Sequence, residues 1–547
     1  MSSKFFHFLI VLTFTSRPAT AQKFLPDDPI LVDKDSEIDA REPRTVRLSD
    51  YYDFLENTFS PPWERLLKPA ASANSLGDVP DSSWFQNRHG RLRMTKEELA
   101  QGPNSGKGPA DGEPWVVIQG KSEGITPGFR IRDSLGDSYV IKFDPLTNPE
   151  MATSSEIIST RFFYAMGYYV PENYLVFFRR DQLRVDPAAE ISVGLGPPRQ
   201  MTERDLDDLL LRVSRTSDIR FRAVASKLIE GRPIGPFKYF GTRRDDPNDV
   251  IPHEERRELR GLRVFSSWLN HDDSRAVNTL DTVITRDGRR FVRHYLIDFG
   301  STLGSGSVQA QKPRAGWEYL WQPRAVIRRT VTLGLWDSPW IRVRYPNLPS
   351  IGRFESKVFT PQDWRPEYPN AAFENSLPDD DYWAARIVMA FTDEDIAAIV
   401  RAGGLTDSQE EQYLIQSLIE RRDKIGRYYF NRVLSIDNFT LNADTVRFEY
   451  LPERFDFAKQ PDGYVLQWFR FDNRKNEKMF VGKEIPATGL SFQIPTDLLN
   501  ESAPYFGVEV REKKSAARGQ GDAKVSVFMS RLSSLRIVGI DRSWNVE

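Results

Sequence analysis

Cysteine is absent from this chain of 547 residues, and histidine is scarce. Without cysteine the chain cannot form disulfides, thiolate metal sites or a cysteine nucleophile. The five histidines are His7, His89, His253, His271 and His294. None of them has a second histidine at the spacing of a metal-binding pair, which argues against a histidine-based metal hydrolase.

An excess of either charge is also missing. The chain has 75 Lys and Arg residues against 77 Asp and Glu residues, which gives a formal net charge of -2. The whole molecule therefore has no general attraction to nucleic acid or to an anionic membrane. We expect no nucleic-acid partner, although the overall charge does not exclude a local basic groove.

No apolar run reaches the roughly 20 residues that a membrane span needs. A shorter run, Phe5 to Phe14, follows Lys4 and precedes Ala19-Thr20-Ala21. This pattern predicts a signal peptide over residues 1–21 that is cut after Ala21, with no transmembrane segment in the mature chain. We therefore expect an exported protein, periplasmic or extracellular; an uncleaved anchor is the alternative. A large exported chain without disulfides is more typical of bacteria.

Residues 22–111 are polar and rich in proline, which indicates an extended lead-in with short helical pieces such as "LSDYYDFLENTF". Residues 112–230 alternate between strand patterns, such as "WVVIQGK" and "SYVIKFD", and the helix pattern "PEMATSSEIISTRFFYAM". This region is predicted to be rich in β-strands.

Residues 231–436 are predicted to be mainly helical, with one β-hairpin that turns at Asp287-Gly288. A late helix is expected to start at a capping box formed by Thr406 and Gln409. In residues 437–547 apolar residues recur at every second position, as in β-strands. This pattern predicts a separate β-sandwich of the immunoglobulin or fibronectin-III kind.

One polar segment, "SSWLNHDDSRAVNTL", has the residue types that phosphoryl transfer requires. Such a reaction needs a carboxylate near the acceptor hydroxyl, oxygen ligands for a divalent metal and cations on the phosphates. Asn278 follows Asp273 by five residues, and Arg275 lies between them. Past the predicted hairpin, Asp298-Phe299-Gly300 ends a strand, where an aspartate can reach a metal that bridges phosphates.

Two further charged residues precede this segment. Lys142 lies inside the apolar strand "SYVIKFD", where a buried ammonium group is costly without a carboxylate or phosphate partner. Glu156 on the next helix could supply that carboxylate, and we prefer it to Glu150 at the helix start.

Two loops are candidates for contacts with a nucleotide. The segment "GKSEGITPG" contains Gly120, Gly124 and Gly128 between two predicted strands, and its backbone amides could face phosphates. A plain hairpin loop is the alternative. The backbone of Ile229, Glu230 and Gly231 in "KLIEGRPIG" could meet the edge of an adenine.

The order of these features resembles the protein-kinase-like fold over about residues 115–429. "HYLIDFGSTLG" is similar to a segment of phosphoinositide kinases, and "EIISTRFFYAMGYYVPE" is similar to a helix of bacterial HipA-like kinases. CotH-like kinases are a kinase-like family that is also exported. The resemblance implies an α+β, bilobal fold with a β-rich N-lobe (residues 112–230) and a helical C-lobe (residues 231–436), followed by the sandwich.

It also implies an atypical kinase that depends on ATP and Mg²⁺ or Mn²⁺. Lys142 would contact the α- and β-phosphates with support from Glu156, and Asp273 would act as base. Arg275 would contact the transferred phosphate, and Asn278 with Asp298 would hold the metal.

The chain departs from the usual kinase pattern at several positions. Asp272 replaces the arginine of H-R-D, and no A-P-E motif follows Asp298-Phe299-Gly300. We therefore expect an exported phosphotransferase whose acceptor could be a protein, lipid, glycan or small molecule. A catalytically idle kinase-like scaffold and an adenylyltransferase on the same fold are the alternatives.

Overall fold

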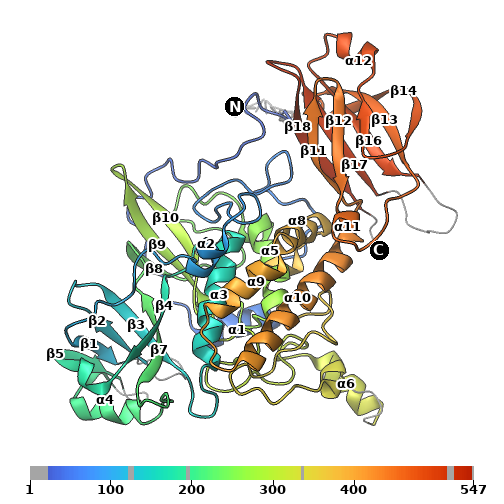
Figure 1. The fold of residues 1–547 in the computed structure, drawn as a ribbon. Coiled ribbons are helices and arrows are strands. Elements are labelled where there is room, and N and C mark those ends of the chain that lie inside the picture. The colour runs from blue at the N-terminus through green and yellow to red at the C-terminus, as the bar shows by residue number, and fades with distance from the viewer. Residues whose placement is uncertain (1–21, 121–127, 193–196, 334–337, 514–522, 545–547) are drawn as a thin grey trace, which may run out of the picture.

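The computed structural model describes residues 22–120, 128–192, 197–333, 338–513 and 523–544. The predicted signal peptide and Gly124 lie outside these ranges. The chain is a mixed α and β structure, with one large sheet at one end, helices in the middle and further sheets at the other end (Figure 1).

The first sheet has seven strands in the order β4-β7-β3-β2-β1-β5-β6. The strands predicted at "WVVIQGK" and "SYVIKFD" are both present in it. Its strands are β1 (Trp115–Gly120), β2 (Gly128–Arg132), β3 (Ser138–Phe143), β4 (Asn173–Phe178), β5 (Leu183–Ile191), β6 (Arg199–Gln200) and β7 (Phe221–Lys227), with helix α4 (Glu203–Leu210) before β7.

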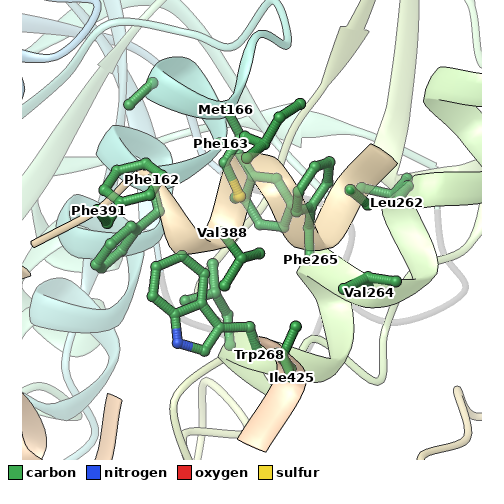
Figure 2. Packing of buried hydrophobic residues seen from close by; sticks show 14 of the residues in the cluster. Phe162, Phe163, Met166, Leu262, Val264, Phe265, Trp268, Val388, Phe391 and Ile425 are labelled. Carbon is green, nitrogen blue, oxygen red and sulfur yellow. The ribbon is translucent and has the colours of Figure 1, made fainter. Parts of the chain in front are cut away.

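Helix α3 (Met151–Met166) crosses from this sheet into the main core. Almost all its residues are buried, because the sheet covers one side and helices cover the other. Figure 2 shows Phe162, Phe163 and Met166 of α3 packed close to Phe265 and Trp268 of α5 (Arg257–Leu269). This core fixes α3 against the segment that follows α5.

Long helices complete that core. They are α8 (Pro378–Met389), α9 (Asp393–Arg401) and α10 (Ser408–Phe430), with the short helices α6 (Pro323–Val331) and α7 (Ala371–Glu374) before them. The expected capping box at Thr406 and Gln409 is wrong. Asp407 is the N-cap of α10, and its side chain accepts hydrogen bonds from the backbone of Gln409 and Glu410. The carboxylate of Asp407, one residue after Thr406, is a stronger hydrogen-bond acceptor for the first backbone amides and its negative charge is favourable at a helix N-terminus.

The predicted hairpin consists of β9 (Thr279–Arg286) and β10 (Arg289–Leu296), and β8 (Arg232–Gly235) pairs with β9. Asp287 and Gly288 have φ angles of 51° and 74°, as a two-residue turn of a twisted hairpin requires. The hairpin separates the loop that contains Asp273 from Asp298.

After α10 the chain forms two sheets, β11-β12-β15 and β14-β13-β16-β17-β18. Val446 and Phe492 of one sheet belong to the same hydrophobic cluster as Leu466 and Val508 of the other. The elements are β11 (Ile436–Asn442), β12 (Thr445–Tyr450), α11 (Leu451–Arg454), β13 (Tyr464–Asp472), β14 (Glu477–Ala487), β15 (Ser491–Gln493), α12 (Thr496–Asn500), β16 (Tyr505–Glu512), β17 (Lys524–Ser530) and β18 (Arg536–Ser543).

The lead-in segment contacts most of the molecule. It includes helices α1 (Asp50–Phe59) and α2 (Lys96–Gln101). Phe24 is buried against the C-terminal sheet, and Val46 donates a backbone hydrogen bond of 2.9 Å to Ile234 at β8. Across the parts of the chain that the structure describes, no helix combines the length and the apolar character needed to cross a membrane.

Candidate active site

Lys142 joins two carboxylates that the chain supplies from distant positions. Its Nζ lies 3.1 Å from Glu156 Oε1 on α3 and 3.0 Å from Asp298 Oδ1 at the end of the β9–β10 hairpin. Burial alone would lower the pKa of Lys142, but the charges of Asp298 and Glu156 outweigh burial and raise it. The lysine is therefore a fixed cation.

Glu156 is held in place by a buried amide. Asn173 Nδ2 donates to Glu156 Oε1 at 3.1 Å and to Thr160 Oγ1 at 2.7 Å. Glu156 Oε2 has no hydrogen-bond partner among the described residues and is buried. A Cβ atom on Gly300 would lie 3.0 Å from Ser307 Oγ, which is a tight contact, and 3.4 Å from Glu156 Oε2, which is close to an ordinary one.

Asp298 has an unusual backbone. Its φ angle is 64°, in the left-handed region that non-glycine residues rarely occupy. Such conformations persist only where the surroundings enforce them, and they gather at functional sites. The next residue, Phe299, is fully buried and stacks on Phe163 of α3 at 4.8 Å between ring centroids. This packing fixes where the Asp298 carboxylate lies.

The loop after α5 brings Asp273 to the same region. Asn278 Nδ2 donates to the backbone oxygen of Asp273 at 2.8 Å, which fixes the loop and leaves the Asn278 side-chain oxygen available as an acceptor. Arg275 Nε contacts Asp273 Oδ1, and its Nη1 lies 2.8 Å from Asp50 Oδ1 and 3.4 Å from Glu367 Oε2.

Asp273 ionises near neutral pH. Burial and the charges of Glu367 and Asp298 together raise its pKa to about 7, against the opposing charge of Arg275. A carboxyl group with this pKa can accept a proton at neutral pH and release it again.

The two residues before Asp273 are buried. Asp272 Oδ1 accepts a hydrogen bond from Gln311 Nε2 at 2.8 Å, and burial raises the pKa of Asp272 well above its usual range. His271 packs against Phe163 and Phe299 with ring centroids 5.7 and 5.8 Å away, and burial lowers its pKa to about 4. His271 is therefore neutral at physiological pH.

A cavity of about 420 Å³ is lined by Asp273, Arg275, Asn278 and Asp298, whereas Lys142 and Glu156 line a smaller pocket that also includes Asp298. The walls of the larger cavity come from the lead-in, the loop after α5, the segment after Asp298 and the segment before α7. The lining includes Asp50, Asp272, Asp273, Arg275, Asn278, Asp298, Ser301, Gln311, Glu318, Leu320 and Glu367. A cavity of this size lies within the range of small-molecule sites.

The predicted nucleotide loops are only partly placed. Gly120 ends β1 and Gly128 opens β2, where Gly128 pairs with Lys142 across the sheet. Ile229, Glu230 and Gly231 connect β7 to β8. Gly231 has a φ of 90°, and a Cβ there would meet Val283 O at 2.5 Å, so a glycine is needed at this turn. Their contacts with a nucleotide stay predictions.

The oxygen donors of the cavity fit a small divalent cation. Asp298 and Asn278 both line it, and Mg²⁺ characteristically takes one or two protein carboxylates together with phosphate and water oxygens. Within the described ranges, no group of three or more His, Cys, Asp or Glu side chains could hold a metal alone.

Several residues of the site were not indicated by the sequence. Asp50 comes from the lead-in and Glu367 from an irregular segment, yet both pair with Arg275. Gln311 and Asn173 orient Asp272 and Glu156. Each is a common polar residue without a motif, so only the fold shows that they belong to the site.

No family model matches the sequence, and no curated protein matches it. One solved structure with a similar chain is the Helicobacter pylori proinflammatory kinase CtkA. The two are 13% identical, and the match covers 57% of this chain and 94% of that chain with a TM-score of 0.30. A similarity this low establishes neither family nor activity.

Proposed function

We propose that this protein is an exported phosphotransferase of atypical kinase type that uses ATP and Mg²⁺ or Mn²⁺. The observation that supports it is the ion-paired set of Lys142, Glu156 and Asp298. A half-buried lysine shared by two carboxylates, next to a cavity with Asp273 and Asn278, suits the binding of a phosphate chain and a cation.

The proposal includes a two-lobed arrangement. The seven-stranded sheet with α3 would form the N-lobe, and α5 to α10 with the β8–β10 sheet the C-lobe. Antiparallel β1, β2 and β3 lie next to β7 and β4, so the Lys142 strand is central and α3 lies against it. The two C-terminal sheets, whose facing side chains share one cluster, would be a sandwich.

In the proposed reaction the oxygen of an acceptor hydroxyl forms a bond to the γ-phosphorus of ATP. The bond between that phosphorus and the β–γ bridging oxygen breaks, and ADP leaves. Asp273 accepts the hydroxyl proton, and Lys142 binds the α- and β-phosphates. Arg275 offers a positive charge within the cavity, and Asn278 with Asp298 would hold the cation. The bound cation would supply positive charge at the phosphate oxygens.

Thermal unfolding with ATP and Mg²⁺ or Mn²⁺ tests this proposal. At a ligand concentration of about 100 times Kd, binding adds about 2.7 kcal/mol of stability, so the unfolding temperature should rise measurably. Asp298→Asn should lose the metal-dependent part of that rise. Asp287→Asn, at the hairpin turn, is the control and should keep it, because asparagine also tolerates a positive φ.

An unchanged unfolding temperature with every nucleotide and metal combination would refute nucleotide binding. If the protein binds ATP, labelled ATP separates the remaining functions. Transfer of the γ-phosphate supports the proposal, transfer of AMP supports an adenylyltransferase, and binding without transfer supports an idle scaffold.

A further inference from the structure

Helix α1 is amphipathic in the reverse sense for a helix on a water-soluble protein. Its buried residues are Asp53 and Asn57, whereas its exposed residues include four large apolar or aromatic side chains. These are Tyr51, Tyr52, Leu55 and Phe59, which are 83%, 59%, 52% and 55% exposed. The spacing of these four places them on one face of the helix.

The acidic groups of α1 have partners in the protein. Asp53 accepts a hydrogen bond from Tyr368 Oη at 2.5 Å, and Glu56 accepts one from Lys238 Nζ at 2.5 Å. Asp50 pairs with Arg275. The outward face of α1 is thus apolar, while its negative charges are neutralised by the protein.

Helix α6 also exposes apolar side chains. Ile327 and Val331 are 60% and 77% exposed, and Leu333 just beyond the helix is 92% exposed. Arg324 and Arg328 are exposed on the same short helix. Figure 1 shows α6 at the edge of the molecule, extending away from the other helices.

The segment that contains α6 is locally basic. Residues 312–333 have five Lys or Arg residues and one acidic residue, Glu318, a net charge of +4 in a chain whose total is -2. Glu318 is paired with Arg329, whose Nη2 lies 3.2 Å away. Lys312 and Arg314 of this segment line the cavity, whereas Arg324 and Arg328 are exposed beside the apolar side chains of α6.

The two helices form one surface at the mouth of the candidate active site. The rings of Phe59 and Trp321 lie 5.8 Å apart, which links α1 to the segment that leads into α6. Asp50, Leu320 and Glu318 line the 420 Å³ cavity. We define the mouth surface as Tyr51, Tyr52, Leu55, Phe59, Trp321, Arg324, Ile327, Arg328, Val331 and Leu333.

We propose that the mouth surface docks on the surface of a membrane that contains anionic phospholipids. Exposed apolar patches rimmed by polar groups mark interaction sites, and arginines next to aromatic and aliphatic side chains are typical of helices that lie in a membrane interface. A projecting helix also fits a flat interface.

This inference does not depend on phosphoryl transfer. Combined with the proposed function, it adds that the acceptor hydroxyl belongs to a lipid or to a molecule held at the membrane, because the cavity opens beside the docking surface. Failure of the vesicle experiment would remove this acceptor class and leave nucleotide binding untouched.

Vesicle sedimentation of the processed chain, which starts near Gln22, tests the docking. The probes are vesicles of phosphatidylcholine alone and of phosphatidylcholine mixed with phosphatidylglycerol. Binding is expected to the mixed vesicles and should weaken as salt rises. Ile327→Glu or Leu55→Glu should weaken it about tenfold or more, because each removes a buried aliphatic side chain from the docked state.

Arg324→Gln should weaken binding about fivefold, as expected from the loss of one cation near an anionic leaflet. Leu211→Glu is the matched control, since Leu211 is 67% exposed at the C-terminal end of α4, outside the mouth surface, and should change nothing. All variants should unfold at the wild-type temperature, because the altered side chains are exposed.

Three results would overturn the proposal: no binding to mixed vesicles, equal binding to both kinds of vesicle, or binding unaffected by Ile327→Glu and Leu55→Glu. Analytical ultracentrifugation without lipid tests whether a second copy of the chain binds to the mouth surface instead. Self-association that these two variants abolish, without vesicle binding, would assign the mouth surface to a second copy of the chain instead.

Discussion

At the scale of single residues, the ionisation of Asp273 links the site to pH. With a pKa of about 7, the carboxyl group is protonated in acid and cannot accept the proton of a hydroxyl. We predict that kcat/KM for ATP turnover falls as the pH drops below about 7. The measurement is a pH profile of ATP turnover, with water as acceptor where no other is known.

The charge of Glu367 raises that pKa, so Glu367→Gln should move the acid limb of the profile to lower pH. Glu318→Gln is a suitable control, since Glu318 lines the same cavity but pairs with Arg329. A midpoint that stays in place in Glu367→Gln would contradict the assignment of Asp273 as the titrating group.

The charged residues that could be predicted from the sequence are those whose neighbours in the sequence form a recognisable pattern. Lys142 stood out because a lysine in an apolar strand needs a partner, and Glu156 does pair with it. Asp298 was indicated by its glycine and by the hairpin before it. Asp50 and Glu367 could not be predicted, because their contacts with Arg275 span 225 residues in one case and arise from a segment without regular structure in the other.

At the scale of elements, the contact between the lead-in and β8 leaves no room for a side chain. Gly235 has a φ of 93°, and a Cβ there would lie 1.9 Å from Val46 O. We predict that Gly235→Ala lowers the free energy of unfolding by roughly 2–4 kcal/mol, because backbone atoms must separate. Thermal or denaturant unfolding measures it.

Gly241→Ala separates this clash from the cost of the backbone angle. Gly241 has a φ of 66°, but no atom lies within 4 Å of a Cβ added there. This variant should cost only about 1 kcal/mol. Equal losses in the two variants would mean that the lead-in does not stay on β8 in solution.

Elements with a strong local signal were predicted well. The β9–β10 hairpin follows from Asp287-Gly288, and α3 and α10 follow from their hydrophobic patterns. The orientation of α1 could not be predicted in this way. Its sequence supports a helix, but an apolar face ordinarily turns inward, and only the structure shows that Asp53 and Asn57 occupy the buried side.

At the scale of the whole molecule, one aromatic residue anchors the start of the lead-in. Phe24 is buried among Phe471, Tyr505 and Phe528, with ring centroids 5.7, 5.8 and 5.1 Å away. Lys23 beside it lies 2.8 Å from Asp541. The first described residues thus complete the core of the last sheet.

We predict that Phe24→Ala destabilises that sheet by about 3–5 kcal/mol, since it empties a buried aromatic site. Amide hydrogen exchange in β13, β16 and β17 should report the loss, with little change in α3 and α5. Leu25→Ala is the matched control, because Leu25 is 50% exposed and should cost no more than about 0.5 kcal/mol. Uniform loss of protection across both regions would contradict a local role.

The sequence predicted several separate hydrophobic patterns but not how they are joined. Residues 22–111 were expected to be an extended lead-in, and their polar, proline-rich composition gave no sign of their partners. Those partners lie in β8, in the loop after α5 and in the C-terminal sheet. Contacts between such distant positions depend on tertiary structure, which local periodicity does not encode.

The position of Phe24 also affects how the protein is made. Lys23 and its partner Asp541 are separated by 518 residues, so the ribosome synthesises the anchor first and its binding site last. Until Phe471, Tyr505 and Phe528 have been synthesised, Phe24 has no pocket to enter, and contacts this distant form slowly. A prematurely terminated chain would leave Phe24 uncovered, which would allow proteases and chaperones to distinguish incomplete products from finished ones.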